Sequence, residues 1–451
     1  MAPWRVRRPP EWGVEPVPER LRRLRAVDIF VLWSSLGVGL LVFVAGSNLL
    51  LYFGLNLWEA LAVSIAGSVT GSILLAASGV LGTASGVPTM VSLRAVLGRR
   101  GSYVPTVLNA FQLLAWAAFE LLVMGLAATA ITGPFLGSAT PYLWIVAFGL
   151  ICGLFAVGGP LVVVRQWIEK FAIWMVFLST ALVAYRLVTL GLDMNLRLAP
   201  EYYLGTTSVL LGLDLVIAMP ISWWPLIADY NRFARSVRSG TTGTLAGYTL
   251  ANVLFYFLGA ALLVGSARGD VFTGIAALGL GAFPLLLILV DETDNGFADI
   301  YSTAVSVQNI RPRWRQLLLV VAATGLAIAA AVALQWNGQS LGGPFNNFLF
   351  AIGGIFVPLL GVMIADYFLV RRGRYAREEF EGVGRRRNVA AFVAWVPGTL
   401  LYLWIFWSAI TSPPGISPLG ATLPSFGLSA GLYWVASVVA SRQATTGAAR
   451  G

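Results

Sequence analysis

The sequence predicts an all-α integral membrane protein with about twelve transmembrane helices. Hydrophobic residues make up 58% of its 451 positions and charged residues only 11%, whereas soluble domains contain about 45–50% and about 25%. Apolar stretches of about 20 residues, the length that crosses a bilayer, recur from one end of the chain to the other. The basic residues, which give a net charge of +10, fall in alternate loops. This charge pattern indicates a membrane partner and not a nucleic acid.

Twelve apolar segments fill the chain between a basic N-terminal arm and a short tail. We expect spans at 28–51, 58–81, 104–132, 141–164, 171–191, 207–228, 244–266, 283–309, 316–334, 346–370, 389–411 and 425–441. Arginine clusters occur in the arm (residues 1–27) and in every second loop, such as 371–388, while Gly133–Thr140 carries no charge. Positive loops stay on the cytoplasmic side, so both termini are predicted to be cytoplasmic, which twelve spans allow. The Arg- and Pro-rich arm does not resemble a cleavable signal peptide.

The residue types that the sequence lacks exclude several kinds of chemistry. The chain has no histidine, which excludes a histidine proton relay and any His-ligated metal site. Its single cysteine, Cys152, excludes an internal disulfide. Without a cysteine pair or acids at metal-binding spacing outside one segment, a membrane-embedded enzyme is disfavoured. We expect no cofactor beyond a coupling ion.

Two predicted spans are interrupted, and they lie five spans apart. Ser34–Gly39 combines two serines with two glycines, which weaken a helix and let its backbone approach an ion or ligand. In Met219–Pro225, two prolines bracket two tryptophans, and each proline removes a backbone donor. In lipid such a break is tolerated where the freed carbonyls face protein or water, and secondary transporters place substrate and ion there. The alternative is a proline kink without a ligand.

An odd number of spans per repeat makes the second copy enter the membrane from the opposite side. We therefore expect an inverted repeat, with two peripheral helices after it. The predicted divisions are the arm 1–27, the repeats 28–191 and 207–370, the basic loop 371–388, the last helices 389–441 and the tail 442–451.

The eighth span carries the densest polarity inside the membrane. One helical face presents Asp291, Asn295, Asp299, Ser302, Ser306 and Asn309, flanked by Glu292, Asp294, Thr303 and Gln308. A charge at the bilayer centre costs at least ~2.5–3.5 kcal/mol, so these residues should face the bundle interior or a cavity. For residues 291–294 an alternative is a solvated rim near the outer surface. Asp299, Ser302 and Thr303 form a hard-oxygen set that suits a small cation.

The third span places Gln112, Trp116 and Glu120 at successive i, i+4 positions. An indole can stack on a flat ring, and an acid one turn away can accept hydrogen bonds from the edge of that ring. Two alternatives are that Trp116 only packs against other helices and that Gln112 bonds a neighbouring helix.

Several strings in the chain are similar to those of one known family. It resembles the nucleobase:cation symporter-1 family, which comprises the purine–cytosine permeases and their hydantoin, allantoin and uracil relatives. The strings that carry the resemblance lie in Gly13–Pro18, Gly86–Ser102, Ala228–Phe233, Ile300–Thr303 and Ala365–Tyr367. The match covers nearly the whole chain.

The resemblance implies a leucine-transporter-like fold, a five-plus-five inverted repeat with broken helices 1 and 6 that works by alternating access with a cation. It places substrate stacking on Trp116, a hydrogen bond on Glu120 and a helix 8 amide at Gln308. The predicted substrate-binding residues are Gly39, Gln112, Trp116, Glu120, Met219, Pro220, Ser222, Trp223 and Gln308. The predicted cation-binding residues are Ser35, Val38, Asp299, Ser302 and Thr303.

Two departures from the family pattern bear on the substrate. Pro220 stands where relatives have an aromatic residue, so a two-sided aromatic sandwich is not expected. Glu120 stands where a hydantoin carrier has an amide, and an acid favours a donor-rich edge such as that of an aminopyrimidine or guanine. We expect a monomeric cell-membrane importer of a nucleobase or related heterocycle. The alternative is an amino-acid or other small-solute cation symporter of the same fold. A channel would not need paired broken helices. The oxygen set favours Na+ coupling, and the alternative is H+ carried by Asp299.

Overall fold

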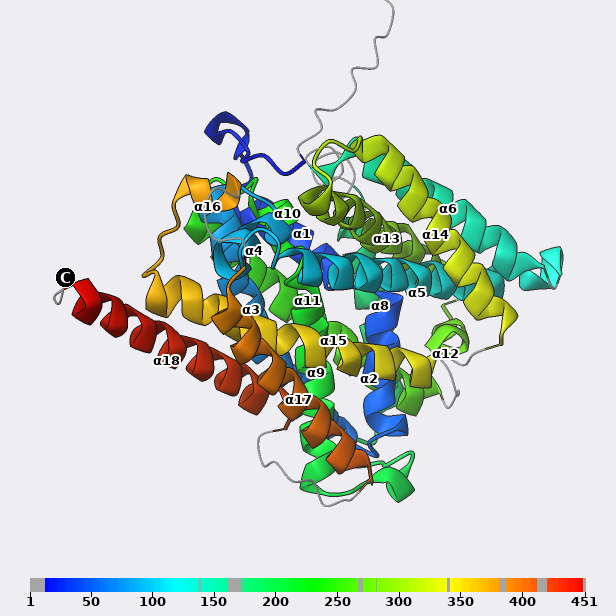
Figure 1. Ribbon diagram of the computed structural model, residues 1–451. Helices are drawn as coiled ribbons and strands as arrows, with labels where there is room; N and C mark the ends of the chain where they lie inside the picture. Colours follow the sequence, from blue (N-terminus) through cyan, green and yellow to red (C-terminus); the bar gives the residue numbers. More distant parts are fainter. Residues whose placement is uncertain are drawn as a thin grey trace, which may run out of the picture.

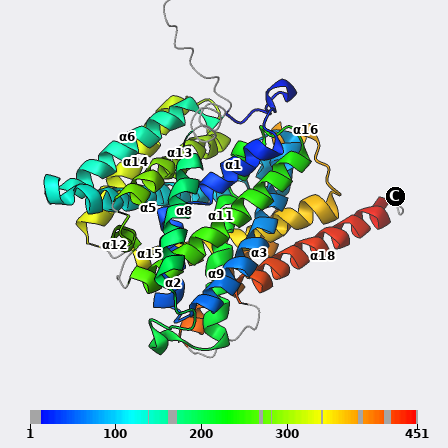
Figure 2. The same cartoon turned by 180° about the vertical axis from the view of Figure 1, so that it is seen from behind.

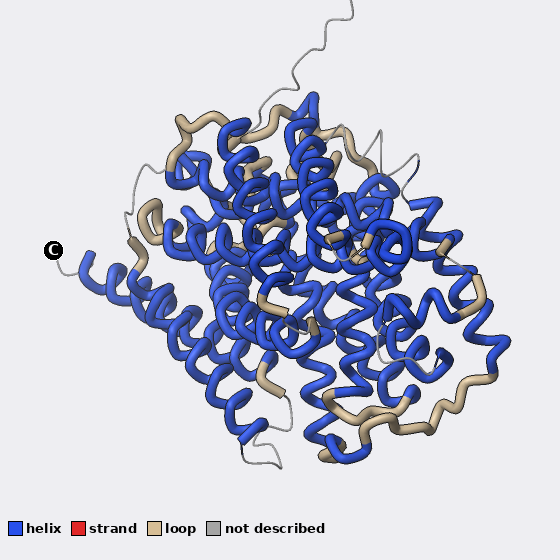
Figure 3. The backbone as a smooth tube through the Cα atoms, turned by 90° about the vertical axis from the view of Figure 1, so that its right-hand side faces the viewer, coloured by secondary structure: helices blue, strands red, loops and turns tan. Residues whose placement is uncertain are grey.

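The structure is all-helical in the part of the chain that it describes. The computed structural model describes residues 13–137, 139–160, 171, 173–266, 271–280, 282–338, 341–381, 387–411 and 420–448 (Figure 1). Across these residues the tube view shows helices joined by loops, and one isolated bridge pairs Leu24 with Ala234 (Figure 3). Parts of several predicted segments lie outside the described residues: the arm 1–27, the spans 141–164 and 171–191, the loop 371–388, the uncharged loop 412–418 and the tail 442–451.

The helices follow the predicted spans closely. The two interrupted spans are α1 (Ala26–Leu36) with α2 (Leu40–Leu51), and α9 (Thr206–Trp223) with α10 (Ile227–Asn231). The other long helices are α3 (Leu57–Ser85), α5 (Tyr103–Leu136), α6 (Thr140–Gly158), α8 (Ile173–Leu190), α11 (Val237–Ser266), α13 (Phe283–Ile310), α14 (Gln316–Trp336), α15 (Gly342–Ile364), α17 (Val389–Thr411) and α18 (Thr422–Ala448). Short elements are η1 (Glu19–Leu21), α4 (Thr89–Leu97), α12 (Val271–Ala277), η3 (Pro200–Tyr202), the π-helical turn η4 (Ala365–Val370) and α16 (Arg377–Glu381).

Eleven of the twelve predicted spans are apolar enough to cross a bilayer by themselves. Among the described residues, ten helices meet this requirement, and the bent pair α1–α2 makes an eleventh. The exception is α13, the eighth predicted span. It is 28 residues long, but its 291–299 stretch contains four acids. Its polarity must therefore be compensated by neighbouring helices.

Local signals in the sequence explain where α3 begins and ends. The side chain of Asn56 accepts a hydrogen bond from the Glu59 amide at 2.9 Å, and the Glu59 carboxylate accepts one from the Asn56 amide at 3.0 Å. This reciprocal pair satisfies two of the amides that a helix start leaves free. The helix ends at Gly86, whose φ of +75° lies in the left-handed region that glycine adopts without strain.

The helices pack in two groups around the first broken span. In one group α11 lies along α1, α2 and α3, and α3 also contacts α9, as the view from behind shows (Figure 2). In the other group α13 lies along α5 and α6, and α14 covers α5 and α6 (Figure 1). The last two helices, α17 and α18, contact each other and α15 at the side of the molecule. This placement agrees with the predicted peripheral position of the last two spans.

Glycines bring α1 and α2 into direct backbone contact with α11. A Cβ on Gly247 would lie 2.4 Å from the Phe30 carbonyl oxygen, and one on Gly259 would lie 2.2 Å from the Phe43 carbonyl oxygen. Membrane helices use such small residues because dispersion contacts between close backbones stabilise them in lipid. The broken span is therefore held on one side by a surface that tolerates no added side chain.

The N-terminal arm is tied to the same end of the molecule as α10. The Arg22 guanidinium donates to the carbonyl oxygens of Thr83 and Ser85, at 3.3 and 3.2 Å, which the last turn of α3 leaves free. The Arg232 guanidinium donates to the Gly13 carbonyl oxygen at 2.7 Å. These bonds anchor Gly13 and Arg22, which lie at the two ends of the stretch that precedes α1.

Candidate functional site

The break in the first span lies directly against α13. Helix α1 ends at Leu36, α2 begins at Leu40, and their axes differ by 58°. The Val38 carbonyl accepts a hydrogen bond from Asn295 Nδ2 at 2.9 Å, and the Leu40 amide donates to Glu292 Oε2 at 2.9 Å. Side chains of α13 therefore satisfy backbone groups that the break frees, as an unwound segment in lipid requires.

Ser35 and Gly39 also face α13. The Ser35 hydroxyl donates to Asp291 Oδ1 at 2.7 Å. A Cβ on Gly39 would lie 3.1 Å from Asn295 Nδ2 and 3.2 Å from Glu292 Oε1. The segment that the sequence predicts to approach an ion or ligand therefore lies against polar side chains of α13. Its partners are the acids of α13 that precede Asp299.

Five carboxyl groups gather next to this break. They are Glu120 of α5 and Asp291, Glu292, Asp294 and Asp299 of α13, and we call them the carboxyl cluster. None of the five is more than 3% exposed. Within the described residues, no Lys or Arg forms an ion pair with any of the five.

Burial of residues 291–294 settles one alternative from the sequence. Asp291, Glu292 and Asp294 are 0% exposed, so a solvated rim near the outer surface is wrong. The physical reason is the bend of the first span, which brings backbone donors and the Ser35 hydroxyl to this turn of α13.

The site contains an unusual number of buried polar atoms without a hydrogen-bond partner. Buried polar groups are normally hydrogen-bonded, so atoms left free mark places where a ligand, a proton or water completes the site. Within the described residues the free atoms at the site include Gln112 Oε1, Trp116 Nε1, Glu120 Oε2, Asp291 Oδ2, Glu292 Oε1, both carboxylate oxygens of Asp294 and Asn295 Oδ1. They come from α5 and α13, on the two sides of the break.

Trp116 packs perpendicular to two phenylalanines of α15. Its ring centroid lies 5.6 Å from that of Phe345 and 5.3 Å from that of Phe348, both in T-shaped arrangements. The side chain is 4% exposed, and Glu120 follows it one helical turn later. Such perpendicular contacts are favourable pairings of aromatic rings and hold the plane of the indole.

The second span is interrupted at the end of the predicted segment Met219–Pro225. Helix α9 passes through Pro220 and ends at Trp223, and the chain turns over residues 224–226 before α10. The proline that ends the helix is therefore Pro225, and Pro220 is accommodated inside α9. A Cβ on Gly71 of α3 would lie 2.2 Å from Pro220 Cγ, so the Pro220 ring packs against α3.

The other predicted residues of α9 lie around the end of the helix. The Ser222 hydroxyl donates to the Met219 carbonyl at 2.7 Å, and the Ser222 carbonyl accepts from Gln112 Nε2 at 3.3 Å. The Trp223 ring contacts Trp33 of α1 edge-on, with centroids 6.0 Å apart. Gln112 thus joins α5 to the break in α9, which is the helix-bonding alternative recognised in the sequence.

The five predicted cation-binding residues do not converge on one point. Ser35 and Val38 contact Asp291 and Asn295. The Ser302 hydroxyl instead lies 3.5 Å from the Tyr230 hydroxyl of α10, seven residues or about 10 Å further along α13 than Asn295.

The remaining two cation candidates, and Gln308, also lie further along α13. The Thr303 hydroxyl donates to the Asp299 carbonyl of its own helix at 2.7 Å. Asp299 follows Asn295 by one turn of α13 and is buried, so we count it with the carboxyl cluster. Gln308 donates to the Trp314 carbonyl at 2.9 Å, sixteen residues or about 24 Å along the helix from Glu292. Gln308 therefore lies away from Trp116 and Glu120.

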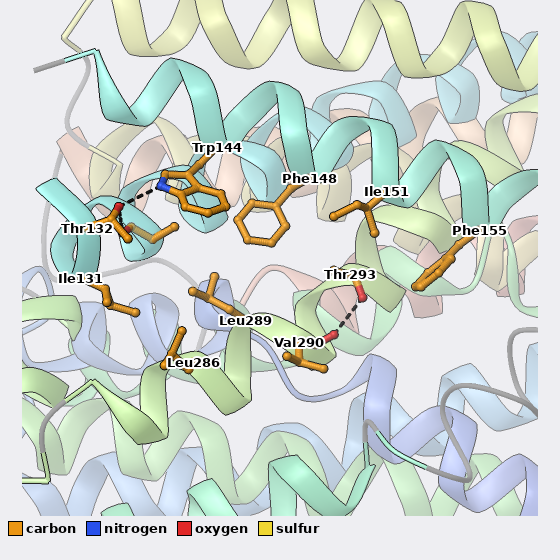
Figure 4. Close-up of a pocket in the computed structure, with 11 residues that line it drawn as sticks. Ile131, Thr132, Trp144, Phe148, Ile151, Phe155, Leu286, Leu289, Val290 and Thr293 are labelled. Atoms are coloured by element: carbon orange, nitrogen blue, oxygen red, sulfur yellow. Dashed lines mark hydrogen bonds between the residues drawn. The ribbon is translucent and has the colours of Figure 1, made fainter. Parts of the chain in front are cut away.

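A separate apolar cavity lies on the side of α13 that faces α5 and α6. Its volume is about 280 Å³, and it is lined by Ala128, Ile131, Thr132, Trp144, Phe148, Ile151, Phe155, Leu286, Leu289, Val290 and Thr293 (Figure 4). The indole N–H of Trp144 already donates a hydrogen bond to Thr132 Oγ1, at 2.8 Å. A polar heterocycle would lose its hydrogen bonds to water there without replacement. The polar site next to the break is thus the better candidate for a small heterocycle.

The chain was compared with known proteins. Residues 16–436 match the sequence family described as permease for cytosine/purines, uracil, thiamine and allantoin. A hydantoin permease of Microbacterium maritypicum is 26% identical over 373 residues, which cover 78% of this chain and 74% of the relative. The cytosine permease of Escherichia coli (strain K12) is 23% identical over 419 residues, covering 90% of both.

Solved structures share the fold. The structure of Mhp1, a nucleobase-cation-symport-1 family transporter, in a closed conformation with bromovinylhydantoin bound, has a TM-score of 0.75 at 20% identity, covering 96% of this chain and 95% of that one. A Na+-coupled sialic acid symporter has a TM-score of 0.59 at 13% identity, with 93% and 90% covered. At these identities the likeness shows the fold alone.

Proposed function

Because the chain belongs to the family of permeases for cytosine/purines, uracil, thiamine and allantoin, which are transporters and not enzymes, we propose that it imports a nucleobase or related heterocycle together with a cation. It works by alternating access. The protein lies in the cell membrane, with both termini in the cytoplasm. The repeats 28–191 and 207–370 supply the two broken helices. The chain acts as a monomer.

One observation carries the proposed substrate class. Trp116 and Glu120 lie one turn apart on α5, both are buried, and each has a polar atom without a partner. A flat ring stacked on the indole would present its edge to the Glu120 carboxylate, which accepts hydrogen bonds from amino and ring N–H groups. The indole N–H is a donor for an exocyclic oxygen or a ring nitrogen.

The charge of the site narrows the substrate further. A carboxylate repels the carbonyl edge of a uracil-like ring and attracts the amino edge of cytosine, adenine or guanine. A zwitterionic amino acid would need a donor for its own carboxylate, and the carboxyl cluster offers mainly acceptors. We therefore favour an aminated base over an amino acid. Competition by leucine against labelled bases tests that choice.

Glu120→Gln is expected to weaken cytosine, adenine and guanine far more than uracil or hydantoin. A charge-assisted hydrogen bond contributes roughly 1.5–3 kcal/mol, which corresponds to about 10- to 150-fold in affinity. The measurement is competition by each base for uptake in proteoliposomes. Glu201→Gln, at an exposed acid in the loop before α9, is the matched control and should change no affinity. Equal losses for all substrates would show that Glu120 does not recognise the amino edge.

A further inference from the structure

We propose that the apolar cavity between α5, α6 and α13 binds one acyl chain of a membrane phospholipid from the outer leaflet. This inference goes beyond the proposed function, because it concerns a second ligand at a site separate from Trp116 and Glu120. It rests on the shape of the cavity, the hydrogen bonds of its lining, its opening and its depth in the membrane (Figure 4).

The first argument is the shape of the cavity, which is an elongated slot. One stripe of α6 forms its long wall, with Trp144, Phe148, Ile151 and Phe155 in a row along the helix (Figure 4). At about 1.5 Å per residue, this stripe is about 16 Å long. The hydrocarbon core of a bilayer is about 30 Å thick, so the slot is as long as the chains of one leaflet. Its volume of about 280 Å³ is roughly twice that of an apolar cavity that binds benzene.

The second argument is that the polar groups of the lining are already paired. The Trp144 indole donates to Thr132 Oγ1 at 2.8 Å, and the Thr132 hydroxyl donates to the Ala128 carbonyl at 2.7 Å. The Thr293 hydroxyl donates to the Val290 carbonyl at 2.8 Å. Every hydrogen-bond donor that the lining side chains carry is therefore used within the protein. A polar ligand would lose hydrogen bonds to water and gain none from these donors, so the cavity selects an apolar ligand.

The third argument is the place where the cavity opens. Two of its lining side chains, Ile151 of α6 and Leu286 of α13, are 40% and 47% exposed. Next to Ile151 on the same helix, Leu150 and Leu154 are exposed as well. Because α6 is a membrane-spanning helix, the apolar surface in its middle is surrounded by lipid chains and not by water. The mouth of the cavity therefore meets the ligand that the bilayer itself supplies.

The fourth argument is the depth of the cavity in the membrane. Thr132, Trp144 and Leu286 each lie three or four residues from the end of α5, the start of α6 and the start of α13. Thr293 lies ten residues, or about 15 Å, into α13, which is near the middle of a bilayer. With both termini in the cytoplasm, as proposed, the slot runs from the outer interface to the midplane. A lipid of the outer leaflet can insert one chain while its headgroup stays at the interface.

Tight packing of α6 keeps the cavity open. A Cβ on Gly149 would lie 2.4 Å from Ile328 Cγ1 of α14, so α6 is held closely against that helix. A Cβ on Gly296 of α13 would lie 2.7 Å from Cys152 Sγ, so α6 and α13 already touch beside the deep end of the slot. Close-packed interiors resist further compression, so α6 cannot move inwards to fill the slot. The cavity is therefore a lasting feature of the bundle in the membrane.

The test uses the full-length protein in nanodiscs of phosphatidylcholine with a photoreactive diazirine in the middle of its acyl chain. After irradiation, mass spectrometry of peptides measures the label on each helix. The reference is the exposed apolar surface of α14 around Ala322, which surrounding lipid contacts without a cavity. We expect label on the cavity side chains of α6 and α13 to be several-fold higher than on this reference surface.

Ala128→Phe is the variant that blocks the site. Ala128 lines the cavity, so an added phenyl ring would occupy the slot in place of the acyl chain. Label on the cavity side chains should then fall to the level of the α14 surface. Ala322→Phe is the matched control, because it makes the same change on the exposed face of α14 and should leave the cavity label unchanged.

Three results would overturn the inference. One is equal labelling of the cavity and the α14 surface in the unaltered protein, a comparison that remains valid if Ala128→Phe fails to fold. Another is cavity label that persists in folded Ala128→Phe, because it would then come from lipid around the bundle. The third is a low cavity label with a different apolar molecule in an organic extract of the purified protein, which would assign the cavity to that molecule.

Discussion

Trp116→Ala is expected to weaken binding of the imported base by about 5- to 150-fold. Stacking of a base on an aromatic ring contributes ~1–3 kcal/mol, and alanine has no ring on which the base could stack. Binding to purified protein by calorimetry, together with the KM for uptake, measures the effect. Trp116→Phe retains an aromatic face and should lose less.

The control for Trp116→Ala is Trp144→Ala. Trp144 lines the apolar cavity between α5, α6 and α13, so its truncation removes a comparable volume away from the proposed site. We expect that variant to bind the base with unchanged affinity. An unchanged affinity in Trp116→Ala, with the protein folded, would exclude Trp116 from the substrate site.

The largest effect on folding is expected from Gly247→Val. A side chain there would meet the Phe30 carbonyl oxygen at 2.4 Å, and a backbone atom cannot rotate away as the end of a side chain can. Overpacking typically costs about 1–3 kcal/mol, and displacing α1 should place this variant at or above the upper end. We expect little monodisperse protein after extraction, and a lowered unfolding temperature in whatever is recovered.

Gly325→Val provides the matched comparison. This glycine lies on the exposed face of α14, and nothing lies within 4 Å of a Cβ built on it. The same substitution in a similar helix should leave yield and unfolding temperature nearly unchanged. Equal losses in the two variants would mean that the glycine contact between α1 and α11 does not hold the bundle together.

The fold was predictable because lipid leaves few solutions for the backbone. Hydrophobic length locates eleven of the twelve spans, and the serines and glycines of Ser34–Gly39 mark a real break. The break after α9 falls at the end of Met219–Pro225, while Pro220, which packs tightly against Gly71, stays inside the helix. Proline spacing predicts that a helix is interrupted, while packing decides which proline ends it.

The sequence predicts which face of each helix carries the site residues, but not which helical turn of that face lies at the site. Periodicity places Glu292, Asp299 and Gln308 on or beside one polar stripe of α13, but it does not say which turn meets the break in the first span. That depends on how far α13 slides along α1 and α5, which is fixed by contacts distant in sequence such as Asn295 to Val38. Trp116 and Glu120 were easier to identify, because a tryptophan and an acid one turn apart stand out in an apolar helix.

The acids of α13 also constrain how the protein enters the membrane during synthesis. The translocon releases a segment into lipid according to its hydrophobicity, and a central aspartate counts against release by about 2.5–3.5 kcal/mol. With four acids within residues 291–299, α13 is a poor candidate for insertion by itself. Its partners α1, α2 and α5 are made earlier, and the strongly apolar α14 follows directly. Insertion of α13 should therefore wait until the earlier helices and α14 are all present. Variants that disturb the first break should then be misinserted and degraded.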